Sequence, residues 1–433
     1  MNDRLKYSPV LKLITILFLI LILMIASFMI QDLIRERETR REEAVFEVSE
    51  KWGREQTITG PILSLPYEVF TINNGRTFTD NGIASFLPEI LKIDGNIESE
   101  IRKRGIYEIP LYNSKLIISG EFKAPDFTEL GIDTNSIKWD KAVMNLGITD
   151  LKGIKGNVTI NFGGKKLNTN PGIQNNRLIK SGITAIIGER LESSAAIPFL
   201  IEIDLSGSNR INFIPAGKST EVKLNSNWIN PGFCGEFLPE KRNITGNGFS
   251  SEWRISHLNR NFPQSWIGTD VNLESSSFGV DFLLPVDQYQ KTMRTSKYDF
   301  LFIGLTFLAF FLIEILNKKH LHPFQYAMIG FALVIFYLLL LSVGEQTNYD
   351  FAFFFSTLSS ISVISLYSLA VLKDKKLVFV ILALLLILYG FLFTIIQMQD
   401  YALIVGSILL FVVLSIVMFL TRKIDWYSIN QQQ

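Results

Sequence analysis

The last third of the chain most constrains its fold, because five long apolar runs follow one another there with only short polar loops between them. Each run has about 17 to 22 residues, enough for a helix rising about 1.5 Å per residue to cross the roughly 30 Å hydrocarbon core of a bilayer. A sixth apolar run lies near the N-terminus. The pattern therefore predicts six membrane spans, at residues 13–30, 300–316, 324–343, 351–372, 377–396 and 402–420.

The composition fits one membrane unit and one globular unit. The chain has 433 residues, of which 48% are hydrophobic, and a long polar insert separates the first span from the other five. Its net charge of +1 gives no reason to expect a nucleic acid or an acidic substrate as a partner. The single cysteine, Cys234, excludes a disulfide within the chain and any metal site built from several cysteines.

Lysines and arginines in the short loops indicate the orientation of the spans. They occur in both terminal tails and in the loops 317–323 and 373–376, which alternation of the spans places on one side of the membrane. The loops 344–350 and 397–400 contain none. Four arginines after the first span oppose this bias, but they alternate with glutamates. We therefore expect a multi-pass protein of the bacterial inner (cytoplasmic) membrane with both termini in the cytoplasm and the large insert in the periplasm.

The first apolar run is expected to remain as an anchor and not to be cleaved as a signal peptide. It is longer than a typical signal-peptide core, and residues 28–32 offer no small-x-small cleavage site. Residues 32–52 carry apolar side chains on one stripe in an Arg/Glu-rich background. This pattern predicts a charged helix that extends the first span as a stalk.

From Gly60 onward, short alternating or β-branched runs separated by Gly, Asn and Pro are typical of strands. We expect a β-rich domain of antiparallel sheets, each with one solvated face, in a sandwich-like arrangement. Residues 84–91 give the strongest helical signal in this region. The predicted strands are 62–67, 108–112, 115–122, 157–162, 199–205, 210–214, 220–224, 253–257, 271–273 and 279–284.

These patterns predict a membrane α-helical protein with a large extracytoplasmic domain inserted between its first two spans. The predicted divisions are a cytoplasmic tail with the first span (1–31), a charged helical stalk (32–59), a periplasmic β-rich domain (60–298), a five-helix transmembrane bundle (299–421) and a cytoplasmic tail (422–433).

Glu314 is the one carboxylate inside an apolar run, and an ionisable residue at membrane depth is a candidate functional site. It lies near the cytoplasmic end of its span, with Lys318 four residues further on, so the two can pair on one helix face. We favour this local ion pair, with the carboxylate reaching towards the membrane surface. Glu314 is nevertheless the candidate intramembrane polar site.

Hydroxyl side chains are concentrated in the span 351–372, where they suggest close helix packing more than a polar path, because no charged residue accompanies them. They are Ser356, Thr357, Ser359, Ser360, Ser362, Ser365 and Ser368. Two acidic residues in external loops, Glu345 and Asp400, are expected to be solvated. The cations Arg102, Lys103 and Arg104 suit anionic lipid head groups, but a solvated charge run is the favoured interpretation.

No catalytic, cofactor-binding or metal site is predicted. Residues 216–220 (Ala-Gly-Lys-Ser-Thr) imitate the end of a phosphate-binding loop, but Asn212 stands where that motif needs glycine and strand-like sequence follows. We expect a hairpin turn there. His320 and His322 lie in a loop without cysteines or clustered carboxylates nearby, and His257 lies in a strand pattern. No G-x-S-x-G motif occurs.

Several stretches together resemble one known family. They include Glu36-Arg37, Trp52-Gly53, Gly60-Pro61-Ile62-Leu63, Arg104-Gly105-Ile106-Tyr107-Glu108, Phe237-Leu238-Pro239, Pro285-Val286-Asp287 and His322-Pro323-Phe324-Gln325-Tyr326 through Gly330 to Glu345. In kind and order they are similar to the CreD family of bacterial inner-membrane proteins, described as cell envelope integrity proteins. The resemblance covers most of the chain and implies a periplasmic domain linked to envelope stress. It implies no catalytic residue.

We therefore expect a non-enzymatic protein that supports envelope integrity or the envelope stress response. The expected partners are the lipid bilayer and a protein or lipid of the envelope. One alternative is a transporter or channel that uses the helical bundle, for which Glu314 and the serine-rich span are the only indications. Another is an envelope enzyme acting on a wall or lipid substrate, which would need a deep pocket with convergent carboxylates.

Overall fold

The computed structural model of the chain describes residues 9–73, 76–173, 178–191, 196–269, 271–284, 288–317, 319–398 and 401–422. The chain divides into a helical unit, Met1–Arg41 with Val286–Gln433, and a β-rich unit, Glu42–Pro285. One continuous helix, α1 (Pro9–Trp52), contributes residues to both units. The charged stretch after the first apolar run is therefore helical and extends that run, as its apolar stripe in an Arg/Glu-rich background predicts.

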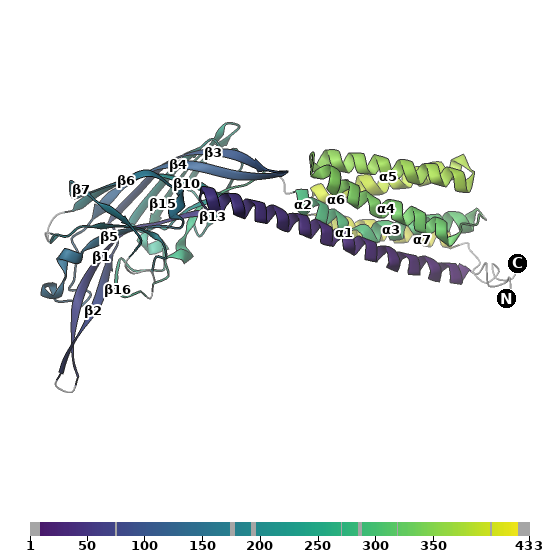
Figure 1. Ribbon diagram of the computed structural model, residues 1–433. Helices are drawn as coiled ribbons and strands as arrows, with labels where there is room; N and C mark the ends of the chain where they lie inside the picture. The colour runs from purple at the N-terminus through teal and green to yellow at the C-terminus, as the bar shows by residue number, and fades with distance from the viewer. Residues whose placement is uncertain are drawn as a thin grey trace. The chain divides into compact units, whose positions relative to one another are not determined.

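Two sheets make up the β-rich unit within the described residues (Figure 1). The first sheet contains, in spatial order, β13 (Pro231–Gly235), β17 (Phe278–Phe282), β11 (Arg210–Phe213), β1 (Gln56–Asn73), β5 (Val143–Ile148), β9 (Gly182–Ile186) and β8 (Thr169–Pro171), with β2 (Arg76–Phe86) paired to β1 and β16 (Ser265–Ile267) paired to β2. The second sheet contains β14 (Lys241–Thr245), β15 (Gly248–Ser256), β12 (Ser219–Ser226), β3 (Ile90–Arg104), β4 (Tyr107–Phe122), β10 (Ile197–Ser208), β6 (Ile154–Phe162) and β7 (Lys165–Leu167). Short 3₁₀ turns in the connections are η2 (Thr134–Ser136), η3 (Trp139–Lys141), η4 (Leu151–Gly153), η5 (His257–Asn259) and η6 (Glu274–Ser276).

One hydrophobic core joins the two sheets. Along the first half of β3, buried and exposed side chains alternate, as expected for a strand with one solvated face. Leu63 and Ile211 of the first sheet belong to the same buried cluster as Ile93 and Leu224 of the second. This shared core fits the sandwich-like arrangement that the alternating runs predict.

The expectation of purely antiparallel sheets is wrong at two pairings. β1 pairs in parallel with β11, and β3 pairs in parallel with β12. Consecutive strands β11 and β12 lie in different sheets, so the segment 216–220 is a crossover between sheets and not the expected hairpin turn. Its backbone amides are used there, since Lys218 N donates to Pro88 O at 2.9 Å and Ser219 N to Glu89 O at 3.0 Å.

Two other local expectations in this unit are also wrong. Residues 84–91 are not helical, because Ala84 and Phe86 pair with Leu65 and Leu63 of β1 and are buried, so strand pairing overrides weak helix propensity. Residues 271–273 form no strand and lead into η6. The runs 108–112 and 115–122 are both strand, as predicted, and they join without a break in the single strand β4.

The helical unit contains α2 (Gln288–Ser296), α3 (Asp299–Leu316), α4 (Pro323–Gly344), α5 (Tyr349–Leu372), α6 (Lys375–Gln397) and α7 (Ala402–Thr421) in addition to the first part of α1. Side-chain caps mark the helix starts: Asn348 Oδ1 accepts from Phe351 N at 2.9 Å, and Asp374 Oδ1 accepts from Lys376 N at 2.9 Å. Within the described residues, α1, α3, α4, α5 and α6 are long and apolar enough to cross a membrane. The apolar part of α7, Ile404–Phe419, is shorter, so the count of six spans stays a prediction.

Helix α2 was not expected. It is nine residues long and buries polar residues at helical spacing, including Tyr289, Thr292 and Thr295. Thr295 Oγ1 lies 2.7 Å from the hydroxyl of Tyr349 at the start of α5. Because this buried face is polar, the hydrophobic pattern of the sequence gives no sign of it.

Candidate functional site

Glu314 lies in the last turn of α3 and is 6% exposed. Its Oε1 atom forms an ion pair with Lys12 Nζ of α1 and accepts a hydrogen bond from Leu321 N at 3.1 Å. Its Oε2 atom accepts from the hydroxyl of Tyr326 in α4 at 3.0 Å. The carboxylate therefore joins three helices, α1, α3 and α4.

Lys12 adds two further contacts to this cluster. Its Nζ atom donates to Leu321 O at 2.8 Å and lies 5.8 Å from the centre of the Tyr326 ring. The lysine side chain is 23% exposed, whereas that of Glu314 is 7% exposed. A buried carboxylate needs both charge compensation and hydrogen bonds, and Glu314 has both here.

The segment before α4 positions Tyr326 by a helix cap. His322 Nδ1 accepts from Phe324 N at 3.2 Å, and Gln325 Oε1 accepts from His322 N at 2.9 Å, while Pro323 occupies the first turn. Such a reciprocal cap fixes the first helical turn, and with it the direction of Tyr326. Tyr326 is 0% exposed, and its ring packs edge-to-face on the Phe307 ring with 5.5 Å between the ring centres.

The expected local pair between Glu314 and Lys318 involves a residue outside the described ones. The observed partner, Lys12, is 302 positions away in the sequence. His320 Nδ1 also lies 3.9 Å from Glu314 Oε1, but its side chain is 61% exposed. No group of three or more His, Cys, Asp or Glu side chains that could hold a metal occurs within the described residues.

We call the contacts of Glu314 with Lys12, Leu321 and Tyr326 a clamp, because they hold three helices together. Both carboxylate oxygens are occupied by donors from Lys12, Leu321 and Tyr326. Proton abstraction or nucleophilic attack would first require one of these contacts to break. The geometry therefore suits fixing α1 against the end of α3 and the start of α4.

A second polar cluster joins the end of α4 to α2 and to the middle of α1. Glu345, expected to be solvated, has a side chain only 12% exposed, so that expectation is wrong. Its Oε1 atom accepts from the Tyr289 hydroxyl at 3.1 Å and lies 3.7 Å from Arg37 Nε. Gln31, which lies near Arg37 in α1, donates to Ser296 O of α2 at 3.3 Å. Sequence reasoning missed this cluster because Tyr289, Ser296 and Glu345 lie beside hydrophobic runs and look like loop residues. Asp400, the other acidic loop residue, lies outside the described residues.

The hydroxyls of α5 are partly used in helix packing, as predicted. Ser360 Oγ donates to Ala332 O of α4 at 3.2 Å and lies 2.9 Å from the Tyr389 hydroxyl of α6. Ser356 and Ser368 are also buried. These contacts bring α4, α5 and α6 together.

The cationic run at the tip of the β3–β4 hairpin is engaged by other side chains of the β-rich unit. Arg104 pairs with Glu47 in the last part of α1 at 2.6 Å, and Arg102 lies 4.1 Å from the centre of the Trp52 ring. Lys103 pairs with Glu108 across the hairpin at 3.1 Å. These contacts attach the end of α1 to the second sheet.

The remaining motifs have structural roles. Gly217 N donates to Thr220 Oγ1 at 3.0 Å and Lys218 pairs with Glu89 at 2.6 Å, so this segment does not wrap a phosphate. His257 begins the 3₁₀ turn η5 and does not continue the strand as expected. Cys234 is half-buried in β13, and burial raises the pKa of its thiol to about 11, with the nearby Asp281 carboxylate as the second cause.

Comparison with known proteins gives one extensive match. Residues 8–427 match the sequence profile of the family described as "Inner membrane protein CreD". The chain is 32% identical over 430 residues to the inner membrane protein CreD of Escherichia coli strain K12, a match that covers 98% of this chain and 95% of the relative.

The similar solved structures are distant. They include the M1 zinc metallopeptidase from Deinococcus radiodurans, with a TM-score of 0.20 and 5% identity, and a mutant of it bound to a Tyr-Ser-Ala substrate, with a TM-score of 0.22 and 6% identity. Each alignment covers 39% of this chain and 38% of the other. Likeness at this level carries no argument about fold or activity.

Proposed function

The chain belongs to the CreD family of inner membrane proteins, and on that premise we propose that it supports cell-envelope integrity or the envelope stress response without catalysing a reaction. The β-rich unit would bind or sense a protein or lipid of the envelope. The helical unit would anchor it. The observation that carries this proposal is the continuity of α1, which belongs to the helical unit up to Arg41 and to the β-rich unit from Glu42 onward.

Both ends of α1 are held by side-chain contacts. Lys12 is bound at the Glu314 cluster, whereas Glu47 pairs with Arg104 and Trp52 Nε1 donates to Tyr112 O at 3.4 Å. An unbroken helix held in this way suits transmission of a load or a binding event along its length. We therefore assign the Glu314 cluster the role of a clamp at the cytoplasmic end of α1.

The proposed orientation places both termini in the cytoplasm and the β-rich unit in the periplasm. In support, the contact of Lys12 with Leu321 puts the start of α1 and the α3–α4 connection at one end of the helical unit. Helix alternation adds the lysines of 373–376 and Arg422 to that end, and positive charge marks the cytoplasmic side. Fluorescent-protein fusions at either terminus should fluoresce, since both would remain in the cytoplasm.

The alternatives receive less support from the geometry. Transport through Glu314 would need a hydrated path, but both carboxylate oxygens already accept protein donors. A pocket of about 370 Å³ in the β-rich unit includes two carboxylates, Glu68 and Asp133. Glu68 pairs with Lys138 at 2.6 Å and Asp133 caps η2, so neither acts as a free catalytic group.

The test is detergent sensitivity and dye leakage in a host lacking the gene, complemented at matched membrane levels. We expect the deletion to leak and the intact protein to restore the barrier. The variant Glu129→Gln, which changes an exposed carboxylate in the β-rich unit, should restore it equally. Glu314→Gln should restore it less, because the clamp loses its charge pair.

Two results separate the parts of this proposal. A deletion strain that leaks no more than its parent contradicts the integrity role. Full rescue by Glu314→Gln keeps the integrity role and removes the clamp from it.

A further inference from the structure

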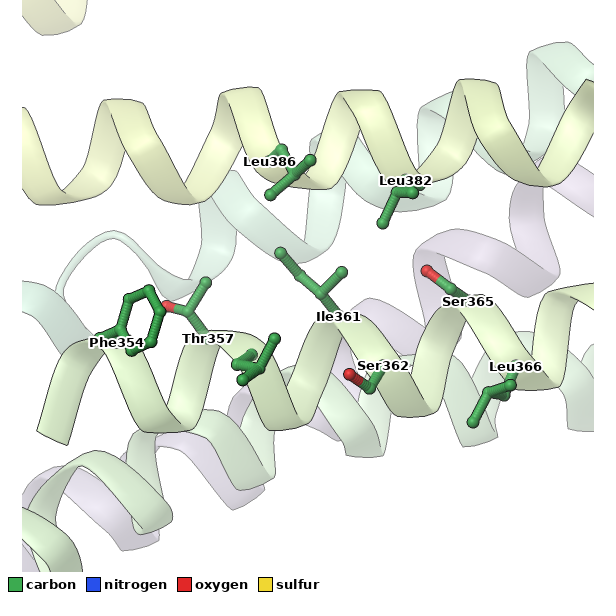
Figure 2. A pocket seen from close by; sticks show the side chains of 9 residues that line it. Phe354, Thr357, Ile361, Ser362, Ser365, Leu366, Leu382 and Leu386 are labelled. Atoms are coloured by element: carbon green, nitrogen blue, oxygen red, sulfur yellow. The ribbon is translucent and has the colours of Figure 1, made fainter.

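Two features of the helical unit lie apart from the Glu314 clamp: a surface groove and a buried carboxyl group. The groove, of about 450 Å³, lies between α5 and α6 (Figure 2). The side chains that line it are apolar or hydroxylic, such as Phe354, Thr357 and Leu386, and none of them is ionisable. Lipid chains suit such a surface. The buried carboxyl group belongs to Asp299, the first residue of α3, and lipid cannot compensate its charge.

Asp299 is only 2% exposed and lies where α1, α2 and α3 meet. Its Oδ1 atom accepts from Phe300 N, and its Oδ2 atom lies 3.5 Å from Gln31 Nε2 of α1, a long contact. The same Gln31 amide group also donates to Ser296 O of α2 at 3.3 Å, so this donor is shared. No Lys or Arg among the described residues forms an ion pair with Asp299. The carboxyl group is therefore buried without a compensating cation.

Glu314, at the other end of α3, shows what compensation of a buried carboxylate looks like. It has the Lys12 ammonium group and two further donors. Asp299 has only its two amide contacts and the positive end of the α3 dipole. A helix N-terminus favours an anion, but by less than it costs to take an unpaired charge out of water. A buried carboxyl group in such surroundings is held in its neutral, protonated form.

The hydroxyl of Tyr337 in α4 is a second, independent observation at this place. It is buried and has no hydrogen-bond partner in the part of the chain that the structure describes. It is close enough to Asp299 for the two groups to interact electrostatically. The nearby Tyr349 hydroxyl, in contrast, already pairs with Thr295 at 2.7 Å. A carboxyl group that lacks a cation and a hydroxyl that lacks a bond thus share one buried region.

The other ionisable groups around this region do not compensate Asp299. The tyrosines of α4, α5 and α6 that interact with one another there stay neutral across the physiological range. The charged residues on the surrounding helices are Asp32, Arg35, Arg37, Lys291, Arg294, Lys297, Glu345 and Asp350. Arg35 pairs with Asp32 at 3.0 Å, and Arg37 lies 3.7 Å from Glu345. Asp299 is therefore the group here whose charge is free to change with a proton.

We propose that Asp299 is a proton-binding site, occupied at neutral pH, which makes the junction of α1, α2 and α3 sensitive to pH. Lys297, two residues earlier, is exposed, so the aqueous phase lies within one helical turn and supplies the proton. With the proton bound, the group is neutral and both donates and accepts hydrogen bonds. When the proton leaves at alkaline pH, an uncompensated charge remains between three helices and destabilises their junction. This site is independent of the proposed role in envelope integrity.

Infrared spectroscopy of the full chain in bilayers tests whether the proton is present. A carbon-13 label on the aspartate carboxyl groups separates the carbonyl stretch of a protonated aspartate from ionised aspartates and from lipid. At neutral pH the intact chain should show this band, and Asp299→Asn should lose it. Asp350→Asn is the matched control and should keep the band, because Asp350 also lies in the first turn of a span but is exposed. An intact chain without the band, or a band that survives in Asp299→Asn, would overturn the proposal.

The unfolding equilibrium of the helical unit, measured against pH by steric trapping in bicelles, tests the consequence. The folded chain keeps a proton that the unfolded chain releases above about pH 4. As the pH rises from there to the point at which folded Asp299 ionises, the unfolding constant of the intact chain should therefore rise up to about tenfold more per pH unit than that of Asp299→Asn. Asp350→Asn should follow the intact chain, and Asp299→Ser provides a second neutral variant. Equal slopes for the intact chain and the neutral variants would refute proton binding at Asp299.

Discussion

Replacing Lys12 by methionine should destabilise the helical unit, and a second change at Glu314 should recover part of the loss. Removing one partner of a buried ion pair costs about 3 to 5 kcal/mol. We expect about 3 kcal/mol for Lys12→Met, at the low end because Tyr326 and Leu321 still donate to the carboxylate. Glu314→Gln should cost about 2 kcal/mol, since Lys12 is partly exposed and keeps its bond to Leu321 O.

The double variant Lys12→Met/Glu314→Gln should cost about 2 kcal/mol, because it leaves no uncompensated charge. The coupling energy between the two residues is then about 3 kcal/mol. Steric trapping of the helical unit in bicelles measures each free energy of unfolding. Lys376→Met, which removes an exposed cation in the first turn of α6, is the control and should change stability by less than about 0.5 kcal/mol. Single effects that add without coupling would refute a direct role of the pair in holding α1.

Three further outcomes follow from other contacts. Gly330→Val should lower the stability of the helical unit by about 1 to 3 kcal/mol in the same assay, since even a Cβ at this position would lie 2.2 Å from the buried side chain of Leu23, whereas Gly390→Val meets open space and should be neutral. Cys234, with a thiol pKa of about 11, should be alkylated at pH 8 about 100-fold more slowly than a free thiol, with a rate that rises until the pH passes that pKa, because only the thiolate reacts. Arg260 is buried, and its Nε and Nη1 atoms have no acceptor in the described part of the chain. Arg260→Met should therefore leave the thermal unfolding temperature of the β-rich unit unchanged or raise it, and a clear fall would show that the guanidinium contributes to stability.

The helix signals of the long apolar runs and of the charged stretch after the first run agree closely with the structure, whereas the weaker signal at 84–91 does not. The apolar run predicted at residues 324–343 forms α4, from Pro323 to Gly344, because His322 and Gln325 cap its start. The charged stretch to Trp52 is helical because its side chains form pairs four residues apart, such as Arg40 with Glu36 at 2.6 Å. These features depend on neighbours in the sequence, so they can be predicted without tertiary contacts.

The pairing of strands that lie far apart in the chain is harder to predict from the sequence. The segment 84–91 has no strong strand signal, yet its first residues are fixed by β1 on one side and by β16 on the other. Likewise, Gly217 looks like part of a hairpin, whereas the strands on either side of it join different sheets. Strand choice depends on partners far away in the chain, and local propensity is too weak to decide it.

The sequence by itself determined that Glu314 is a carboxylate at membrane depth and that it must be compensated, because an unpaired buried charge is too costly to keep. It also determined which side of the helical unit collects positive charge. Only the tertiary structure decided that the compensating charge is Lys12 of α1, with Tyr326 and Leu321 as further donors. The physical reason is that an ion pair within one helix can be read from a spacing of four residues, whereas a pair between helices depends on how those helices pack.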